Sequence, residues 1–144
     1  MVYPDNMAIA HSITPDLPTL LHQVGTSVAV VGATDDLNKH GARIYRDLKS
    51  KGFTVFAVNP HRYEVDGDQC WNSVGDLPTA PTIVDFVVPP GETLDILADC
   101  LELGYTNVWI QPGAEDAAVV DYLSEAGFNY LINACVRVHA RPVG

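Results

Sequence analysis

The stretch that decides the fold is SVAVVGAT, residues 27–34. Its four apolar residues, from Val28 to Val31, run without interruption into Gly32. A continuous apolar run that ends in a turn signal is typical of a strand buried on both faces of a sheet. The small and polar residues that follow lead into a helical pattern. The stretch therefore predicts a strand, a tight glycine turn and the start of a helix.

This succession also predicts an anion site. The first backbone N–H groups of a helix have no partner inside the helix, and the helix dipole adds partial positive charge at the same end. We therefore expect the turn from Gly32 to Thr34 to bind the phosphates of a nucleotide.

Strands and helices alternate outward from this stretch. Further strands are predicted at 53–58, 82–88, 106–110 and 128–132, and helices at 14–24, from 35–39 to 51, at 93–103 and at 115–126. Residues 61–81 are expected to be loop, with one short helix near 73–77. Such alternation predicts an α/β fold: a three-layer, doubly wound parallel sheet of about five strands, Rossmann-like, in a single domain.

Helical spacing also predicts which side chains face the core. Thr14 is expected to cap the first helix, with Pro15 in its first turn. The expected inward residues are Leu17, Leu20, Leu21 and Val24 in the first helix, Ile44, Tyr45 and Leu48 in the second, and Leu94, Leu97, Ala98 and Leu101 in the third.

Length and composition are those of one soluble domain. The chain has 144 residues, 47% of them hydrophobic and 18% charged, and no apolar run approaches the roughly 18 residues that span a membrane. Cys70, Cys100 and Cys135 are odd in number and lack CxxC spacing, which favours reduced thiols. No secretory signal is visible, so we expect a cytoplasmic protein, with 1–13 as a flexible arm and 14–144 as the domain.

The charge distribution favours a local anion site. The net charge of −10 argues against a nucleic-acid-binding protein. Six of the eight basic residues nevertheless lie between positions 39 and 62, while 91–126 holds eight acids and no base. The basic cluster is interpreted either as part of the anion site or as the solvated face of a helix.

Five turn motifs follow the predicted strands. The carboxyl ends of parallel strands share one edge of the sheet, and ligands bind there at the point where strand order reverses. The motifs are Gly32-Ala33-Thr34, Asn59-Pro60, Val88-Pro89-Pro90, Gln111-Pro112-Gly113 and Asn133-Ala134-Cys135.

The motif for a nicotinamide dinucleotide is incomplete. Thr34 and Leu37 stand where GxGxxG requires glycines, and the second strand ends at Asn59 without the acid that holds a ribose. No P-loop occurs. Arg62, just past that strand, is either a partner for an extra ribose phosphate or a solvated loop residue.

Together these motifs resemble the small coenzyme A-binding proteins, which are similar to the coenzyme A-binding domain of the succinyl-coenzyme A synthetase alpha subunit and of ADP-forming acyl-coenzyme A synthetases. The residues that carry the resemblance are 28–34, Val58-Asn59-Pro60, Leu77-Pro78, Val88-Pro89-Pro90, 108–113 and Cys135. It extends over about 20–139 and implies coenzyme A as the ligand. The sequence departs from the family pattern at Lys39-His40-Gly41 and at Asn133, where many members have aspartate.

The resemblance implies that the diphosphate lies at the glycine turn, that Arg62 lies near the ligand phosphates and that the proline motifs line the rim. The predicted cofactor-binding residues are Gly32, Ala33, Thr34, Lys39, Asn59, Pro60, Arg62, Val88, Pro89, Gln111, Pro112, Gly113 and Cys135.

No residue is assigned to catalysis or to a metal. The histidines lack metal-binding spacing, His40 and His61 are expected at the surface near the rim, and no GxSxG motif occurs. Cys135 is the one candidate nucleophile, with packing beneath the ligand as the alternative.

We therefore expect a protein that binds coenzyme A or acyl-coenzyme A without evident catalytic machinery, as a sensor or as the partner of an acyl-coenzyme A enzyme, and that forms a homodimer. The alternatives are an NAD(P)-binding regulatory protein, and a thiol-redox or acyl-coenzyme A enzyme that uses Cys135. No nucleic-acid or membrane partner is expected.

Overall fold

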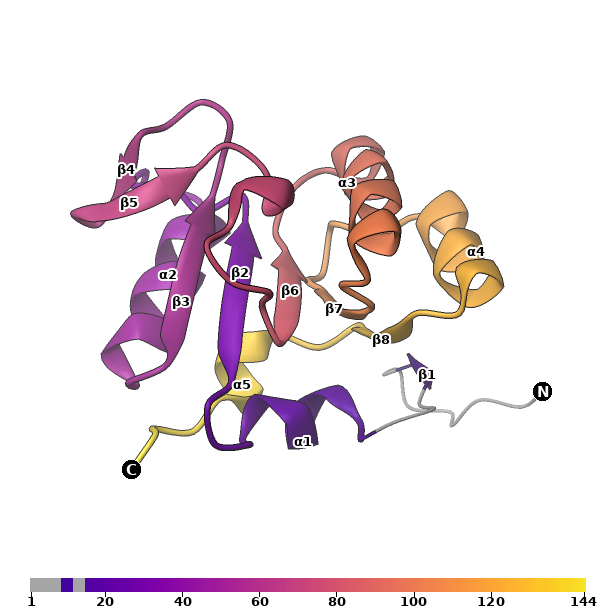
Figure 1. Ribbon diagram of the computed structural model, residues 1–144, viewed down its shortest axis with the longest axis horizontal. Coiled ribbons are helices and arrows are strands. Elements are labelled where there is room, and N and C mark those ends of the chain that lie inside the picture. Colours follow the sequence, from indigo (N-terminus) through magenta and orange to yellow (C-terminus); the bar gives the residue numbers. More distant parts are fainter. Residues whose placement is uncertain (1–8, 12–14) are drawn as a thin grey trace.

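The computed structural model describes residues 9–11 and 15–144 (Figure 1). Its strands are β1 (Ile9–His11), β2 (Ser27–Val31), β3 (Thr54–Val58), β4 (Glu64–Val65), β5 (Asp68–Trp71), β6 (Ile83–Phe86), β7 (Asn107–Ile110) and β8 (Asn129–Ile132). Its helices are α1 (Leu17–Leu21), α2 (His40–Ser50), α3 (Pro90–Leu103), α4 (Ala117–Ala126) and α5 (Val136–His139), with the 3-10 helix η1 at Val74–Asp76.

The described strands form one sheet in the order β1-β8-β7-β6-β2-β3-β5-β4. All pairs from β8 to β5 are parallel, and the two outermost strands, β1 and β4, are antiparallel to their neighbours. The chain passes from β2 to β3 on one side and later returns to β6 on the other side of β2. Strand order therefore reverses at β2, and the predicted doubly wound parallel sheet is confirmed.

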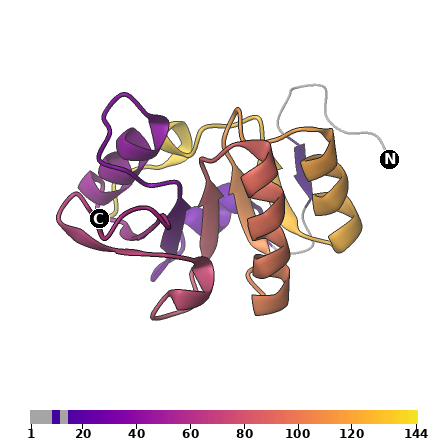
Figure 2. The same cartoon turned by 90° about the horizontal axis from the view of Figure 1, so that it is seen from above.

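Helices cover both faces of the sheet (Figure 2). One apolar cluster joins the face that carries Val28 and Val30 to α1, α2 and α5. The other joins the face that carries Ala29 and Val31 to α3 and α4. All of β2 is buried, as its uninterrupted apolar sequence predicts.

The inward face of α2 is as predicted, with Ile44, Tyr45 and Leu48 buried. In α3 the prediction was partly wrong, because the buried stripe runs through Thr93, Leu97 and Cys100. Leu94 is half-buried, and Ala98 and Leu101 are exposed. A stripe through residues 93, 97 and 100 leaves residues 98 and 101 about 100° away from the core.

The first helix is shorter than predicted. Asp16 caps α1 by accepting a hydrogen bond from the Thr19 N–H, whereas Thr14 lies outside the described residues. The helix ends at Leu21, and Val24 is fully exposed instead of facing the core. The prediction failed there because the chain leaves the helix four residues before Gly25.

The segment predicted as loop over 61–81 contains two short strands besides the predicted short helix. β4 and β5 form a hairpin whose two-residue turn is Asp66-Gly67, with φ of 53° and 79°. Asp-Gly is a favoured pair for a turn that needs positive φ at both positions. β5 also extends the parallel sheet beyond β3.

The predicted flexible arm, 1–13, lies mostly outside the described residues. Within it, Ile9–His11 pair antiparallel with β8. Among the described residues, no helix is long and apolar enough to cross a membrane.

Candidate functional site

The turn after β2 lies at the edge of the sheet where the parallel strands end, and it is closely packed. Gly32 has a φ of 100°, and a Cβ atom there would lie 2.9 Å from both the Val87 carbonyl oxygen and Val88 Cγ1. The backbone of Gly41, in the first turn of α2, meets the Gly32 carbonyl so closely that a Cβ atom would overlap it. Only glycine fits either position, and the helix start rests directly on the turn.

A groove runs along this edge and has two arms, which share Gly32, Lys39 and the Val87–Pro89 segment. We call it the rim groove. The first arm has a volume of about 630 Å³ and is lined in addition by Val31, Thr34, Val58, Asn59, Pro60, His61, Arg62, Asn72, Ser73, Val74, Glu92, Ile96 and Asp99. The second arm, of about 500 Å³, adds Asn38, His40, Gly41, Pro90, Pro112, Gly113 and Ala114.

Most of the residues predicted to bind the cofactor line this groove. They are Gly32, Thr34, Lys39, Asn59, Pro60, Arg62, Val88, Pro89, Pro112 and Gly113. The groove lining does not include Ala33, Gln111 or Cys135. Ala33 is wholly buried, and Cys135 is a half-buried residue that precedes α5.

Gln111 supports the rim from beneath. Its Nε2 donates to Asp85 Oδ1 at 2.5 Å, and its Oε1 accepts from the Val136 N–H at 3.3 Å. The side chain is 3% exposed and links β6, the rim loop after β7 and α5. It holds the neighbouring Pro112-Gly113 turn in place instead of facing the groove.

Asp85 is the buried carboxyl group at the other end of that link. Complete burial on β6 raises its pKa to about 7, against the opposing effect of the hydrogen bond from Gln111. Its Oδ2 has no hydrogen-bond partner among the described residues. Burial of a carboxylate in apolar surroundings disfavours the charged form, which explains the direction of the shift.

Asn59 joins the loops after β2 and β3. Its Nδ2 donates to the Ala33 carbonyl at 2.9 Å, and its Oδ1 accepts from the His61 N–H at 2.9 Å. Both functional ends of the amide are therefore engaged within the protein.

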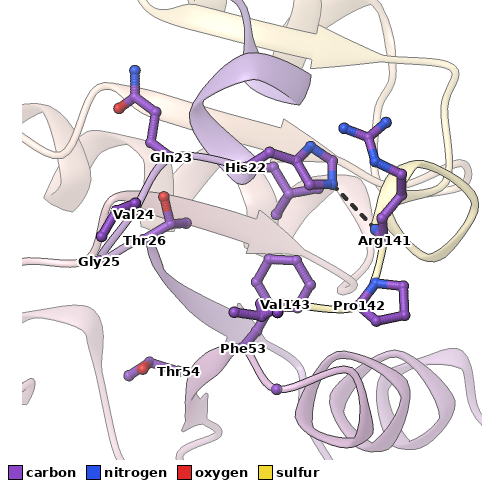
Figure 3. A pocket seen from close by; sticks show the side chains of 13 residues that line it. His22, Gln23, Val24, Gly25, Thr26, Phe53, Thr54, Arg141, Pro142 and Val143 are labelled. Carbon is purple, nitrogen blue, oxygen red and sulfur yellow. Dashed lines mark hydrogen bonds between the residues drawn. The ribbon is translucent and has the colours of Figure 1, made fainter.

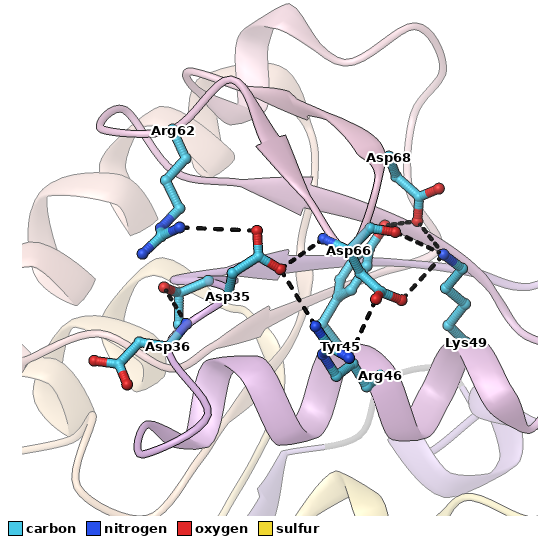
Figure 4. Close-up of polar contacts among 9 residues, drawn as sticks. Asp35, Asp36, Tyr45, Arg46, Lys49, Arg62, Asp66 and Asp68 are labelled. Atoms are coloured by element: carbon cyan, nitrogen blue, oxygen red, sulfur yellow. Dashed lines mark hydrogen bonds and ion pairs between the residues drawn. The ribbon is translucent and has the colours of Figure 1, made fainter.

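The cations and acids of the groove come from different walls. Lys39 precedes α2, whose N-terminus has no side-chain cap, and Arg62 follows β3. Arg62 Nη1 lies 3.8 Å from Asp35 Oδ2 (Figure 4). Glu92 and Asp99, on α3, line the facing wall. An anionic ligand group is accordingly favoured on the side of Lys39 and Arg62.

Several lining residues were not predicted. Glu92, Ile96 and Asp99 share one stripe of α3, at spacings of four and three residues, which places them on one helix face. Asn72 and Ser73 directly follow Trp71, the last residue of β5. No local motif predicts that Asn72 and Ser73 line the groove, because their position depends on the pairing of β5 with β3.

The cysteines inside the described core are poor nucleophiles. Burial raises the pKa of the Cys70 thiol and raises that of Cys100 to about 12, so both remain protonated near neutral pH. Within residues 9–11 and 15–144, no group of three or more His, Cys, Asp or Glu side chains is arranged to hold a metal ion.

A further cavity, of about 470 Å³, lies at the opposite end of the sheet between the α1–β2 turn and residues 141–144 (Figure 3). His22 Nε2 accepts there from the Arg141 N–H at 3.1 Å. No residue of the predicted site lines this cavity.

Two curated relatives are similar to part of the chain. The acetate–CoA ligase [ADP-forming] II of Archaeoglobus fulgidus is 32% identical over 92 residues, and the alpha subunit of the corresponding Pyrococcus furiosus enzyme is 33% identical over 84 residues. These matches span 62% and 58% of this chain but only 13% and 18% of the two relatives.

Solved structures show the same fold, in small proteins and within a larger enzyme. A conserved hypothetical protein from Pyrococcus furiosus is 38% identical with a TM-score of 0.77, over 80% of this chain and 99% of that one. A protein from Thermus thermophilus is 31% identical with a TM-score of 0.75, over 85% and 92% of the two chains. A dinucleotide-forming acetyl-coenzyme A synthetase of Ca. Korarchaeum cryptofilum is 28% identical with a TM-score of 0.64, over 80% of this chain and 27% of that one.

The family itself is identified by a match across most of the sequence. Residues 26–141 match the model of the CoA binding domain, and the predicted resemblance is confirmed. The glycine turn, the proline-rich rim and the parallel sheet lie within this match. The chain therefore belongs to the CoA-binding domain family.

Proposed function

We propose that the rim groove binds coenzyme A or an acyl-coenzyme A, and that the protein acts as a sensor of this ligand or as the partner of an acyl-coenzyme A enzyme. The observation that carries the proposal is the turn at Gly32, which approaches both α2 and the Val87–Val88 backbone so closely that no side chain fits. Gly32 also lines the rim groove, so a phosphate group in the groove can approach the backbone of this turn. The uncapped N-terminus of α2 beside it favours negative charge.

The two arms of the groove suit the two ends of this ligand. The diphosphate is assigned to the shared part, near Gly32 and Lys39, with Thr34 beside it in the first arm. The arm that contains Arg62 and Asn72 combines these polar side chains with apolar walls, which suits a phosphorylated adenosine. The arm lined by Pro90 and the Pro112-Gly113 turn suits the extended pantetheine.

A nicotinamide dinucleotide fits less well. In that class an acid at the end of the second strand holds the ribose hydroxyls. Asn59 occupies this place, and its amide is engaged with the Ala33 carbonyl and the His61 N–H. This supports coenzyme A over NAD(P).

The alternative of an enzyme that uses Cys135 receives little support from the geometry. The thiol precedes α5 and is not part of the groove lining. We expect Cys135→Ser to bind coenzyme A as the wild type does. A lower affinity of this variant for coenzyme A would show that Cys135 belongs to the binding site.

The relatives favour a role alongside acyl-coenzyme A chemistry. Those that match are named as acetate–CoA ligases, and this chain is similar to a small part of each. Dimer formation and cytoplasmic location stay predictions.

The test is calorimetry of the full chain with coenzyme A, acetyl-coenzyme A, NAD, NADP and ADP. We expect coenzyme A and acetyl-coenzyme A to bind more tightly than the other three. Arg62→Ala should weaken coenzyme A binding by about 1.5–3 kcal/mol, the range for hydrogen bonds to charged groups.

Arg141→Ala is the matched control for that substitution, because Arg141 lines the cavity at the opposite end of the sheet. Its affinity for coenzyme A should equal that of the wild type. No heat of binding with millimolar coenzyme A, or tighter binding of NADP, would rule out the proposed function.

A further inference from the structure

Arg62 forms an ion pair with a carboxylate that does not itself line the rim groove. Asp35, in the loop between β2 and α2, has Oδ2 3.8 Å from Arg62 Nη1 (Figure 4). Arg62 belongs to the groove lining and Asp35 does not. The carboxylate therefore contacts the guanidinium from outside the groove.

Asp35 is itself fixed in place by the hairpin and by α2. Its Oδ1 accepts from the Asp66 N–H at 2.8 Å and lies 3.5 Å from Arg46 Nη2. Asp66 is the first residue of the two-residue turn between β4 and β5. Asp35 thus ties the loop that begins α2 to the tip of the hairpin.

Two acids of the hairpin, Asp66 and Asp68, are paired with side chains of α2. Arg46 and Lys49 form ion pairs with Asp66 at 3.3 Å and 3.1 Å, and Lys49 also pairs with Asp68 at 2.8 Å. Tyr45 donates to Asp68 at 2.8 Å. Asp66 and Asp68 are thus paired with side chains of α2, whereas Asp35 is shared between Arg46 and Arg62.

A fixed carboxylate restricts a long side chain that otherwise has many conformations. The guanidinium carries five N–H donors in a planar fork, and a single contact to Asp35 leaves most of them for a ligand. An arginine held in this way presents its free donors at one place in the groove, whereas an unrestrained arginine reaches phosphates at several places.

We infer that Asp35 is a positioning residue for Arg62, and that it makes the groove prefer ligands with a phosphate on the ribose. The inference rests on the proposed function. Coenzyme A carries a diphosphate and a separate ribose 3′-phosphate. With Asp35 in place, Arg62 binds the 3′-phosphate alone. Without it, Arg62 also reaches the diphosphate, and the preference falls.

A purely electrostatic role would have the opposite signature. If Asp35 only weakened anion binding by repulsion, removing its charge would strengthen the binding of every phosphate ligand. The more highly charged coenzyme A would gain more than 3′-dephospho-coenzyme A, and the preference would rise. The ratio of the two dissociation constants therefore distinguishes positioning from repulsion.

The experiment is calorimetry of the full chain with coenzyme A and 3′-dephospho-coenzyme A, which differ only in that phosphate. The variants are Asp35→Asn, Asp35→Glu, Asp66→Asn, Arg62→Ala and the double variant Asp35→Asn/Arg62→Ala. Asp35→Asn keeps the oxygen that accepts from Asp66, so the hairpin contact survives. Asp35→Glu keeps the charge and moves it.

We expect Asp35→Asn and Asp35→Glu each to lower the preference for coenzyme A by about threefold or more, within the range of a partly exposed ion pair. Asp66→Asn is the matched control, with the same chemical change in the same network and without contact to Arg62, and it should keep the wild-type preference. Asp35→Asn should change nothing further once Arg62 is alanine.

Three results overturn this inference alone: a preference in Asp35→Asn that is unchanged or higher, an unchanged preference in Asp35→Glu, or a wild-type protein that binds both ligands equally. Should Asp35→Asn fail to fold, Asp35→Glu decides by itself. A wild-type protein that binds neither ligand overturns the proposed function and this inference with it.

Discussion

Gly32 is the residue at which β2, α2 and the loop after β6 come closest together. The substitution Gly32→Ala adds a methyl group 2.9 Å from the Val87 carbonyl oxygen and Val88 Cγ1, at a φ of 100°. We expect it to lower the free energy of unfolding by about 1–3 kcal/mol, measured by urea titration, because the backbone is strained and the neighbours must move. Coenzyme A binding should be lost.

Gly25→Ala provides the matched control for that substitution. Gly25 has a φ of 81°, but a Cβ atom there meets nothing within 4 Å, and the residue lies at the other end of β2. It should cost stability through backbone strain alone and leave the affinity for coenzyme A unchanged. Wild-type affinity in Gly32→Ala would contradict the placement of phosphate at this turn.

At the scale of elements, the hydrogen-bonded link from Asp85 through Gln111 to Val136 joins β6, β7 and α5. The pKa of Asp85 rises from 3.8 to about 7 in the folded protein, so the folded state binds its proton more tightly than the unfolded state does. The contribution of this group to the free energy of unfolding should therefore be greatest below pH 4, fall between pH 4 and pH 7, and level off above pH 7.

Asp85→Asn removes this titration. Urea unfolding at a series of pH values should show a stability that decreases between pH 4 and pH 8 for the wild type, by up to a few kcal/mol, and less steeply for the variant. Asp16→Asn is a suitable control, because the pKa of this exposed helix cap is lowered by its hydrogen bond from Thr19. Equal slopes for wild type and Asp85→Asn would refute the assignment.

The elements differ in how far their sequences predict them. β2 and α2 carry complete local signals, an apolar run and an amphipathic stripe, and both were predicted with their inward faces. The β4–β5 hairpin was missed although Asp66-Gly67 marks its turn, because β5 is largely polar and its pairing with β3 is a long-range contact.

The same distinction explains the site. Gly32, Asn59 and Pro112 end predicted strands and were expected at the rim. Asn72 reaches the groove only through β5, and Glu92 only because α3 starts at Pro90 rather than near residue 93. The close approach of Gly41 to Gly32 depends on the angle at which α2 meets the turn, and the sequence pattern does not specify that angle.

The whole molecule is acidic, with a net charge of −10, but one wall of the rim groove carries the cations Lys39 and Arg62. Sodium chloride should therefore have opposite effects on folding and on binding. Screening reduces repulsion among the acids, so the urea midpoint should rise between roughly 0.01 and 0.3 M salt, a range over which the Debye length shrinks to a few ångströms.

Over the same range the affinity for coenzyme A should fall, because salt also screens the attraction of Lys39 and Arg62 for phosphate. Sucrose at matched osmolality serves as the control for effects that are not ionic. An affinity that increases with salt would show that the acidic surface, and not the cationic wall, dominates the approach of the ligand.

The two tryptophans lie in different surroundings. Trp109 is wholly buried, its indole N–H donates to the Ala134 carbonyl at 2.8 Å, and its ring meets His139 edge-on. Trp71 is half-buried and directly precedes the groove residues Asn72 and Ser73. The protein thus contains its own fluorophores: Trp71 to report occupancy of the groove by a change in emission, and Trp109 as an internal reference whose spectrum changes only when α5 or the core does.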